Sequence, residues 1–348
     1  MKEEMNSAER VFTTMDHEEP DRVPFTLNLN LHGAKLLAVS LKEYFSKPEN
    51  LVKAQIHFKK KYDIDIVSSF FYTSLEFEAF GGTSIFYEDG PPNAGRPIFR
   101  NKKDIMNFKT PEVYETSETI KILETTKLLK EEFKDEVAIL GVATSPFSLP
   151  VMQLGFKNYI DLIYDDQELF ETLIDKNEKF CIEFSNAQLE AGADAIAYID
   201  PMSSPSIIPK DLLLKTGLKI AKRTIEKIQG NVAFHHASAQ NMEIIDVLKE
   251  LGIVGFAASS FEDLSKLKRM CKNELTIMGN LNGIEMCRWN PEQAKNKVLN
   301  AIRSAGAGGG FILTDNHGEI PYQVPEKIIE TISKTVKKFG KYPLTGIK

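Results

Sequence analysis

Two adjacent histidines, His235 and His236, follow a short apolar run, Val232–Phe234, whose composition predicts a buried strand. Neighbouring side chains on a strand point to opposite faces, so one imidazole should face the interior of the fold and the other should face away. An imidazole at such a position can carry a proton or bind a metal. Which chemistry applies depends on what the other strands bring to the same end.

Polar side chains follow several other predicted strands in the same way. Histidine together with carboxylate suits zinc or another divalent metal. The same groups are also the usual acid–base equipment of enzymes. The spacing contains no HExxH-type motif, so the sequence alone identifies no metal. The catalytic candidates are His235, His317 and Asp200, and the substrate-binding candidates are Asn28, Tyr72, Ser145, Asn280 and His236.

Eight apolar, β-rich runs alternate with longer helical patterns along the chain. Strand followed by helix eight times predicts an α/β fold of the (β/α)8 TIM barrel type, with the site at the carboxyl ends of the strands. A doubly wound sheet is the alternative, but it needs a Gly-rich phosphate turn after its first strand, and none is present. The predicted strands are 22–29, 64–71, 137–142, 193–199, 232–234, 253–258, 275–278 and 310–313.

The helical patterns between these runs are regular enough to give boundaries. The segment 159–191 is long, and Asp165 and Asp166 favour a break within it, so two helices are an option there. Pro291 and Pro325 stand where the first turn of a helix tolerates proline. The other predicted helices are 48–62, 117–133, 210–228, 242–251, 263–272, 291–305 and 325–339.

One insertion, residues 75–116, separates the second predicted strand from the third. Two β runs around a Gly/Pro turn within it predict a β-hairpin. A hairpin that leaves the carboxyl end of the second strand should cap the mouth of the barrel. We therefore expect residues 1–348 to form one barrel domain with this single insertion.

Composition restricts the class of protein. A net charge of −6 argues against a nucleic-acid surface, which needs a basic excess. The three cysteines are far apart and form no CxxC motif, as expected in a reducing compartment. The first residues do not resemble a signal peptide, and no apolar run is long enough to cross a bilayer. We expect a cytoplasmic protein, which pairs as a homodimer if it follows the habit of many barrels.

Several motifs, in this order, resemble the uroporphyrinogen decarboxylase superfamily and, within it, the cobalamin-dependent methyltransferases. The resemblance covers nearly the whole chain and implies a (β/α)8 barrel. The motifs are RVFTTMDHEEPDRVPF, EAGADAIAYIDPMSSPSIIP, FHHASAQN, MGNLNGIEM and GGGFILTDNHGEIPYQVPEKI.

The decarboxylase branch is disfavoured by one difference. That branch has an arginine-rich segment after the first strand, which holds the acidic side chains of the porphyrinogen. Here the corresponding residues are LNLNLHGAK, with no arginine. A tetrapyrrole with many carboxylates would lose its bidentate charge partners.

The thiol-methylating branch implies a zinc site made of His-x-Cys after strand five and a cysteine after strand eight. His235 matches the histidine, whereas Ala237 and His317 replace the two cysteines. In one interpretation a metal is still held by His235, His317 and a third group, and it polarises an ether or amine. The candidates for the third group are His236, Glu76, Glu78 and Asp200. In the other interpretation no metal is bound, and a histidine assists the leaving oxygen or nitrogen.

Both interpretations predict a corrinoid-dependent methyltransferase of the demethylase type, active in one-carbon metabolism. It would move a methyl group from a small methylated ether, amine or thiol to cobalt. The chain lacks an Asp-x-His-x-x-Gly motif, so the cobalamin-type corrinoid should be supplied by a separate partner protein. The alternatives are a methylcobamide:thiol methyltransferase of the coenzyme M kind and a non-catalytic binding barrel.

Overall fold

Seven parallel strands form one curled sheet. The structure is a computed structural model that describes residues 4–316 and 318–344. The strand order is β1-β4-β5-β6-β7-β8-β9, and every neighbouring pair is parallel. The strands are β1 (Ile66–Ser68), β4 (Ala138–Thr144), β5 (Ala195–Ile199), β6 (Asn231–His235), β7 (Gly255–Ala257), β8 (Thr276–Asn282) and β9 (Phe311–Asn316).

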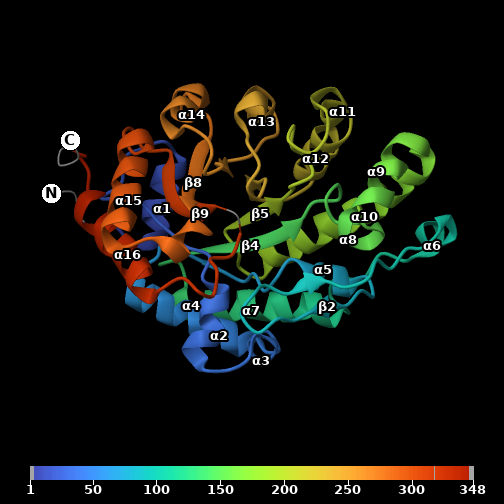
Figure 1. Cartoon of the computed structure of the whole chain (residues 1–348), viewed down its shortest axis with the longest axis horizontal. Helices are drawn as coiled ribbons and strands as arrows, with labels where there is room; N and C mark the ends of the chain where they lie inside the picture. Colours follow the sequence, from blue (N-terminus) through green and yellow to red (C-terminus); the bar gives the residue numbers. More distant parts are fainter. Residues whose placement is uncertain (1–3, 317, 345–348) are drawn as a thin grey trace.

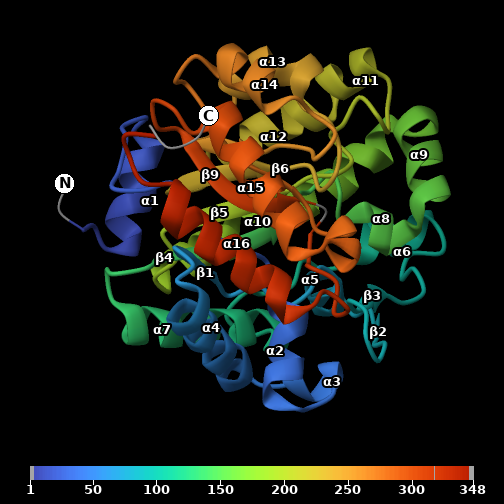
Figure 2. The ribbon, with the colours of Figure 1, turned by 60° about the vertical axis from the view of Figure 1, so that its left-hand side comes forward.

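The helices form an outer layer around this sheet (Figures 1 and 2). No helix in the described part of the chain is both long enough and apolar enough to span a membrane. The helices are α1 (Ser7–Met15), α2 (Asn30–Leu37), α3 (Leu41–Tyr44), α4 (Pro48–Tyr62), α5 (Ser74–Ala79), α6 (Lys102–Asn107), α7 (Ser117–Phe133), α8 (Pro150–Leu154), α9 (Phe156–Asp165), α10 (Gln167–Glu190), α11 (Lys210–Lys215), α12 (Gly217–Ile225), α13 (Ile245–Lys249), α14 (Leu264–Cys271), α15 (Pro291–Ala305) and α16 (Glu326–Phe339).

The first predicted strand, 22–29, is not a regular strand. It lies between the two edges of the sheet: the Thr26 amide donates to Leu313 of β9, and the Asp65 amide donates to Phe25. Pro24 has no N–H to donate, and the Phe25 amide is taken by the Asp65 carboxylate. This segment therefore bridges the edges of a curled sheet through isolated contacts, an arrangement consistent with a TIM-like barrel.

The predicted hairpin is present as a short antiparallel pair, β2 (Ser84–Ile85) and β3 (Asn93–Ala94). Its turn contacts the loop after β9, because the Gln323 side chain donates to the Asp89 carboxylate at 2.8 Å. The hairpin thus lies on the side of the molecule where the strands end.

Most predicted helices are confirmed, and the differences have local causes. The long segment 159–191 is indeed two helices, α9 and α10, with Asp166 capping α10 through its side chain. The segment 210–228 is also two helices, which meet at Thr216. The first helix, α1, was not predicted, although Asn6 and Glu9 form a capping box at its start.

An apolar cluster identifies the inner face of the sheet. Ile66, Ala138 and Ile312 come from β1, β4 and β9, and they pack together with Val11 of α1. Strands so far apart in the sheet can meet only on the side that the curl encloses. Helix α1 therefore closes the end of the fold opposite to the strand ends. Gly309 allows this contact, because a Cβ there would lie 2.3 Å from the Glu18 carbonyl oxygen.

A buried ion-pair network fixes α1 and the segment 22–29 to β1. The Asp65 side chain is fully buried and accepts hydrogen bonds from Arg10 at 2.7 Å, Arg22 at 2.6 Å and Ser7 at 2.8 Å. Three segments that are far apart in the sequence are therefore held by one carboxylate, at the end of the sheet away from the candidate site.

Candidate active site

Strand register decides which of the two histidines faces inward. Thr144 lies on the same face of β4 as Ala138, three alternations along the strand, so it faces inward. Thr144 pairs with Ile199, and Ile199 pairs with His235. His235 therefore lies on the inner face at the end of β6. His236 follows on the outer face, where its ring packs against Phe234, with the ring centroids 4.4 Å apart.

Hydrogen bonding fixes the tautomer of His235. Its Nδ1 accepts the backbone N–H of Ala237 at 3.0 Å. A nitrogen that accepts carries no proton, so the neutral ring carries its proton on Nε2. Burial lowers the pKa of His235 to about 4, so the ring is neutral near pH 7. His235 thus presents an uncharged Nε2–H donor to the inner face of the strand ends.

Asn316, the last residue of β9, holds the turn that orients His235. Its Nδ2 donates to the Ala237 carbonyl oxygen at 2.8 Å, and its Oδ1 accepts from the Ser260 amide at 3.3 Å. Ala237 has a φ of +53°, a left-handed conformation that a residue with a Cβ adopts only when its surroundings impose it. Asn316 was not among the predicted site residues, because the sequence gives no signal of this contact across the strand ends.

His236 and Asp200 lie together behind the strand ends, on the outer face. His236 Nδ1 and Asn241 Oδ1 are 2.5 Å apart, and Asn241 Nδ2 donates to Ala257 and Glu262, so the histidine nitrogen is the donor. His236 Nε2 and Asp200 Oδ2 are buried and have no partner in the described residues. Burial lowers the pKa of His236 to about 4 and raises that of Asp200 to about 6.

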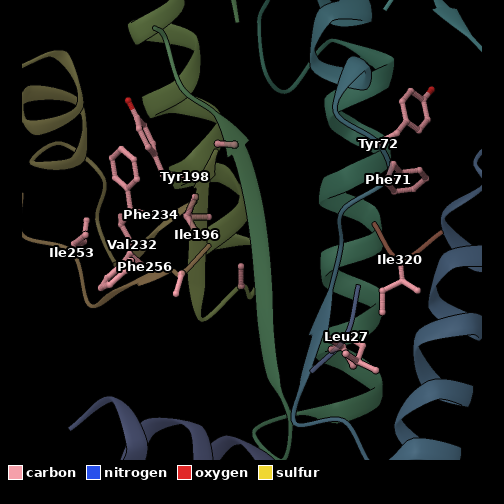
Figure 3. Close-up of a cluster of buried hydrophobic side chains, with 14 of the residues drawn as sticks. Leu27, Phe71, Tyr72, Ile196, Tyr198, Val232, Phe234, Ile253, Phe256 and Ile320 are labelled. Atoms are coloured by element: carbon pink, nitrogen blue, oxygen red, sulfur yellow. The ribbon is translucent and has the colours of Figure 1, made fainter. Parts of the chain in front are cut away.

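Serine side chains complete this outer group. Asp200 Oδ1 accepts from Ser148 at 2.6 Å, and Ser145 accepts the Ser148 amide at 2.9 Å. Asp200 also donates its backbone N–H to the His235 carbonyl oxygen, which places the group directly behind His235. Figure 3 shows Tyr198 and Phe234, from β5 and β6, side by side, and their ring centroids are 5.4 Å apart. These contacts position the ends of β5 and β6.

Glu76 caps the end of β4 from helix α5. Its Oε1 accepts from the Thr144 amide at 2.8 Å and from the Thr144 hydroxyl at 2.9 Å. Burial raises the pKa of the Glu76 carboxyl to about 7, and the hydrogen bonds from Thr144 oppose that rise. Glu76 therefore carries a proton more readily than an ordinary glutamate.

This pKa predicts a pH dependence of stability. Between about pH 5 and pH 7 the folded protein holds a proton on Glu76 that the unfolded chain has released, so the free energy of unfolding falls as the pH rises. Glu76→Gln should remove this contribution and stabilise the protein by up to about 3 kcal/mol at about pH 8. Urea unfolding at about pH 5 and at about pH 8 checks this prediction, with the exposed Glu88→Gln as control. Equal pH slopes for wild type and Glu76→Gln would contradict the assignment.

The remaining candidates form hydrogen bonds with residues other than His235. Asn280 donates to the carbonyl oxygens of Ser259 and Glu262, so its amide nitrogen fixes the loop after β7. Asn28 donates its backbone N–H to Asp315 and is half-buried. The Tyr72 hydroxyl donates to Glu78 at the edge of the fold.

The described residues do not fit the zinc site that the sequence resemblance implies. His317 lies outside the described residues, and no three His, Cys, Asp or Glu side chains within them come together as metal ligands. Position 237 is alanine, and the Glu76 carboxylate is taken by Thr144. Binding a metal through His235 Nε2 would move its proton to Nδ1, where it would point at the Ala237 amide.

Comparison with known proteins identifies one family over nearly the whole chain. Residues 6–339 match the family described as Uroporphyrinogen decarboxylase (URO-D). A methylcobamide:CoM methyltransferase of Methanosarcina acetivorans is 26% identical over 229 residues, covering 62% of this chain and 66% of that protein. A uroporphyrinogen decarboxylase of Citrifermentans bemidjiense is also 26% identical, over 259 residues, covering 71% and 73%. Identity alone does not separate the two activities.

Among solved structures, a methyltransferase from Methanosarcina mazei superimposes with a TM-score of 0.85. The match covers 97% of this chain and 99% of that one at 18% sequence identity. At this identity the match shows a shared fold, and it extends over nearly the whole chain.

Proposed function

Because the chain belongs to the uroporphyrinogen decarboxylase (URO-D) family, we propose that it is a corrinoid-dependent methyltransferase of the demethylase type. It would take a methyl group from a small methylated ether, amine or thiol. The observation that carries this proposal is the neutral Nε2–H of His235 on the inner face of the strand ends. That group is a donor for a leaving heteroatom, and it is ill suited to activating a thiolate.

The corrinoid of a separate partner protein would supply the cobalt nucleophile that accepts the methyl group. As the methyl–heteroatom bond breaks, the oxygen, nitrogen or sulfur keeps the bonding pair. His235 Nε2–H would donate a hydrogen bond to that atom and stabilise the charge that develops on it. Such a donor acts most strongly when it is fixed in advance and shielded from water. Asn316 and the turn at Ala237 provide that fixation.

Decarboxylation of a porphyrinogen is not supported by the positions of the arginines near the amino terminus. Arg10 and Arg22 are buried and paired with Asp65. They lie at the end of the sheet opposite to the strand ends. The segment after 22–29, which forms α2, contains no arginine. Carboxylates of a tetrapyrrole would therefore lack their bidentate partners in that part of the site.

The activity is tested with free cobalamin reduced to Co(I) as acceptor, because the partner protein is not needed to detect slow transfer. Methoxylated aromatics, methylamines and methylated thiols serve as donors, and the change in the cobalamin absorbance reports methylation. We expect the wild-type protein to demethylate at least one donor class. Conversion of uroporphyrinogen with loss of carbon dioxide, and no methylation of cobalamin with any donor, would overturn the proposal.

The role of Asn316 gives a second expected result. Asn316→Ala removes the hydrogen bonds to Ala237 and Ser260, so the turn should no longer fix the imidazole of His235. Methyl transfer should fall roughly 10- to 100-fold, the range found when a group that orients a metal-binding histidine is removed. Asn296→Ala, exposed on α15, is the control and should leave the rate unchanged. A normal rate in Asn316→Ala would show that the turn does not depend on this residue.

A further inference from the structure

A cavity of about 410 Å³ lies on the side of the strand ends, and His235 is not among the residues that line it. We call it the rim pocket. Its walls come from α3, α5, the start of α7 and the β2 segment of the hairpin. Three aromatic side chains line it, with the Tyr72 ring centroid 5.1 Å from that of Phe45 and 5.4 Å from that of Phe86, both edge to face. Phe45 and Tyr72 are largely buried behind the pocket, and Phe86 is the partly exposed ring of the three. The volume of the pocket is typical of a small-molecule site.

Four charged side chains line the same pocket, and their charges cancel. Glu78 accepts a hydrogen bond from the Tyr72 hydroxyl at 3.2 Å. Burial raises the pKa of that hydroxyl, and the negative charges of Glu78 and Glu118 raise it further. Lys42 comes from α3 and Lys121 from α7. None of these four side chains forms an ion pair in the described part of the chain. The Lys121 ammonium lies over the Phe71 ring, 5.8 Å from its centroid. Two carboxylates and two ammonium groups that form no ion pair among the described residues thus line the pocket, where a ligand that carries both charges could meet them.

Aromatic rings add a preference among such ligands. A quaternary ammonium has no N–H to satisfy, so it is weakly hydrated and is attracted to aromatic faces as well as to carboxylates. A protonated primary amine needs hydrogen-bond acceptors around all three N–H groups and gains less from an apolar wall. The combination of rings, carboxylates and lysines therefore favours a compact zwitterion with methyl groups on its nitrogen.

We propose that the rim pocket binds a small zwitterion of the N-methylated amino acid class. Glu78 and Glu118 hold its ammonium against the aromatic wall, and Lys42 and Lys121 hold its carboxylate. The pocket and the candidate active site are joined by α5, which carries Glu76 at the end of β4 and Glu78 in the pocket. The site does not rest on the proposed methyl transfer, since binding requires neither corrinoid nor turnover.

Calorimetric titration of the protein alone tests this site with four probes: trimethylglycine, glycine, tetramethylammonium and acetate. We expect saturable binding of trimethylglycine, at least about 5-fold tighter than binding of the other three, because one aromatic contact with a quaternary ammonium is worth on the order of 1 kcal/mol. Glycine lacks the methyl groups, and each of the other two probes lacks one of the charges.

Variants locate the binding. Glu78→Gln and Lys121→Met should each weaken trimethylglycine binding by at least about 5-fold, since each removes one charge-assisted contact. Glu124→Gln and Lys127→Met, exposed on the same helix α7, are the matched controls and should bind like the wild type. Absence of saturable binding, equal affinity for tetramethylammonium, or equal weakening in the controls would each overturn the assignment. If the wild-type protein transfers methyl groups but does not bind trimethylglycine, the assignment of this site is wrong and the proposed function is unaffected.

Discussion

Replacing His235 by alanine is expected to lower the rate of methyl transfer on the order of 100- to 1,000-fold, while leaving the protein folded. The expected loss is that of a fixed hydrogen-bond donor at the atom where charge develops. His235 is half-buried and makes one side-chain hydrogen bond, to the Ala237 amide, so its removal should cost little stability. The rate is measured with Co(I) cobalamin and the best donor, alongside urea unfolding.

Two further variants separate the donor from the ring. His235→Gln keeps a side-chain N–H and should retain part of the activity lost in His235→Ala. His57→Gln, on α4 and distant from the strand ends, should be unaffected. If His235→Ala transfers methyl groups at the wild-type rate, the proposed role of the imidazole is wrong.

Replacing Asp65 by alanine is expected to destabilise the protein by about 3–5 kcal/mol. The change leaves the guanidinium groups of Arg10 and Arg22 buried without this partner, and breaking a buried ion pair from one side has a cost of that size. It also removes the acceptor for the Phe25 amide, so the segment that bridges the two edges of the sheet loses its anchor. The free energy of unfolding in urea measures the effect.

Asp63 provides the control for this prediction, because it is also acidic and also contacts Arg22. Its side chain is 37% exposed, and its ion pairs with Lys59 and Lys337 lie at the surface. Asp63→Ala should therefore cost no more than about 1 kcal/mol. A loss of similar size in the two variants would show that burial of the Asp65 network does not decide its contribution.

The regular part of the fold could be predicted from the sequence, because the spacing of the apolar residues agrees there with the positions of the capping and turn residues. Helices α4 and α7 have the predicted boundaries, and the break at Asp166 follows from its capping of α10. The segment 22–29 has strand composition but not strand pairing, because Pro24 lacks a donor and Asp65 takes the Phe25 amide. Because Asp65 is distant in the sequence, the local pattern of residues 22–29 does not predict its hydrogen bond with the Phe25 amide.

In the candidate site, too, local sequence predicted some features, and contacts between distant segments decide the others. Alternation along a strand predicted that His235 and His236 face opposite ways, but only the register from β4 to β6 decides which one faces inward. The tautomer of His235 depends on the turn at Ala237, and that turn depends on Asn316, about eighty residues later. Tyr72 was predicted as a substrate-binding residue because it follows a strand, and it lines the rim pocket, to which α5 and the hairpin also contribute.

The central claim, that His235 is a neutral Nε2–H donor, is tested most directly by nitrogen NMR of protein labelled with ¹⁵N-histidine. The signal that disappears in His235→Gln identifies the ring. At neutral pH the claim predicts a neutral imidazole protonated on Nε2, with titration only near the lowered pKa of about 4. A ring protonated on Nδ1, an imidazolium at neutral pH, or a nitrogen shifted by a bound metal would contradict it.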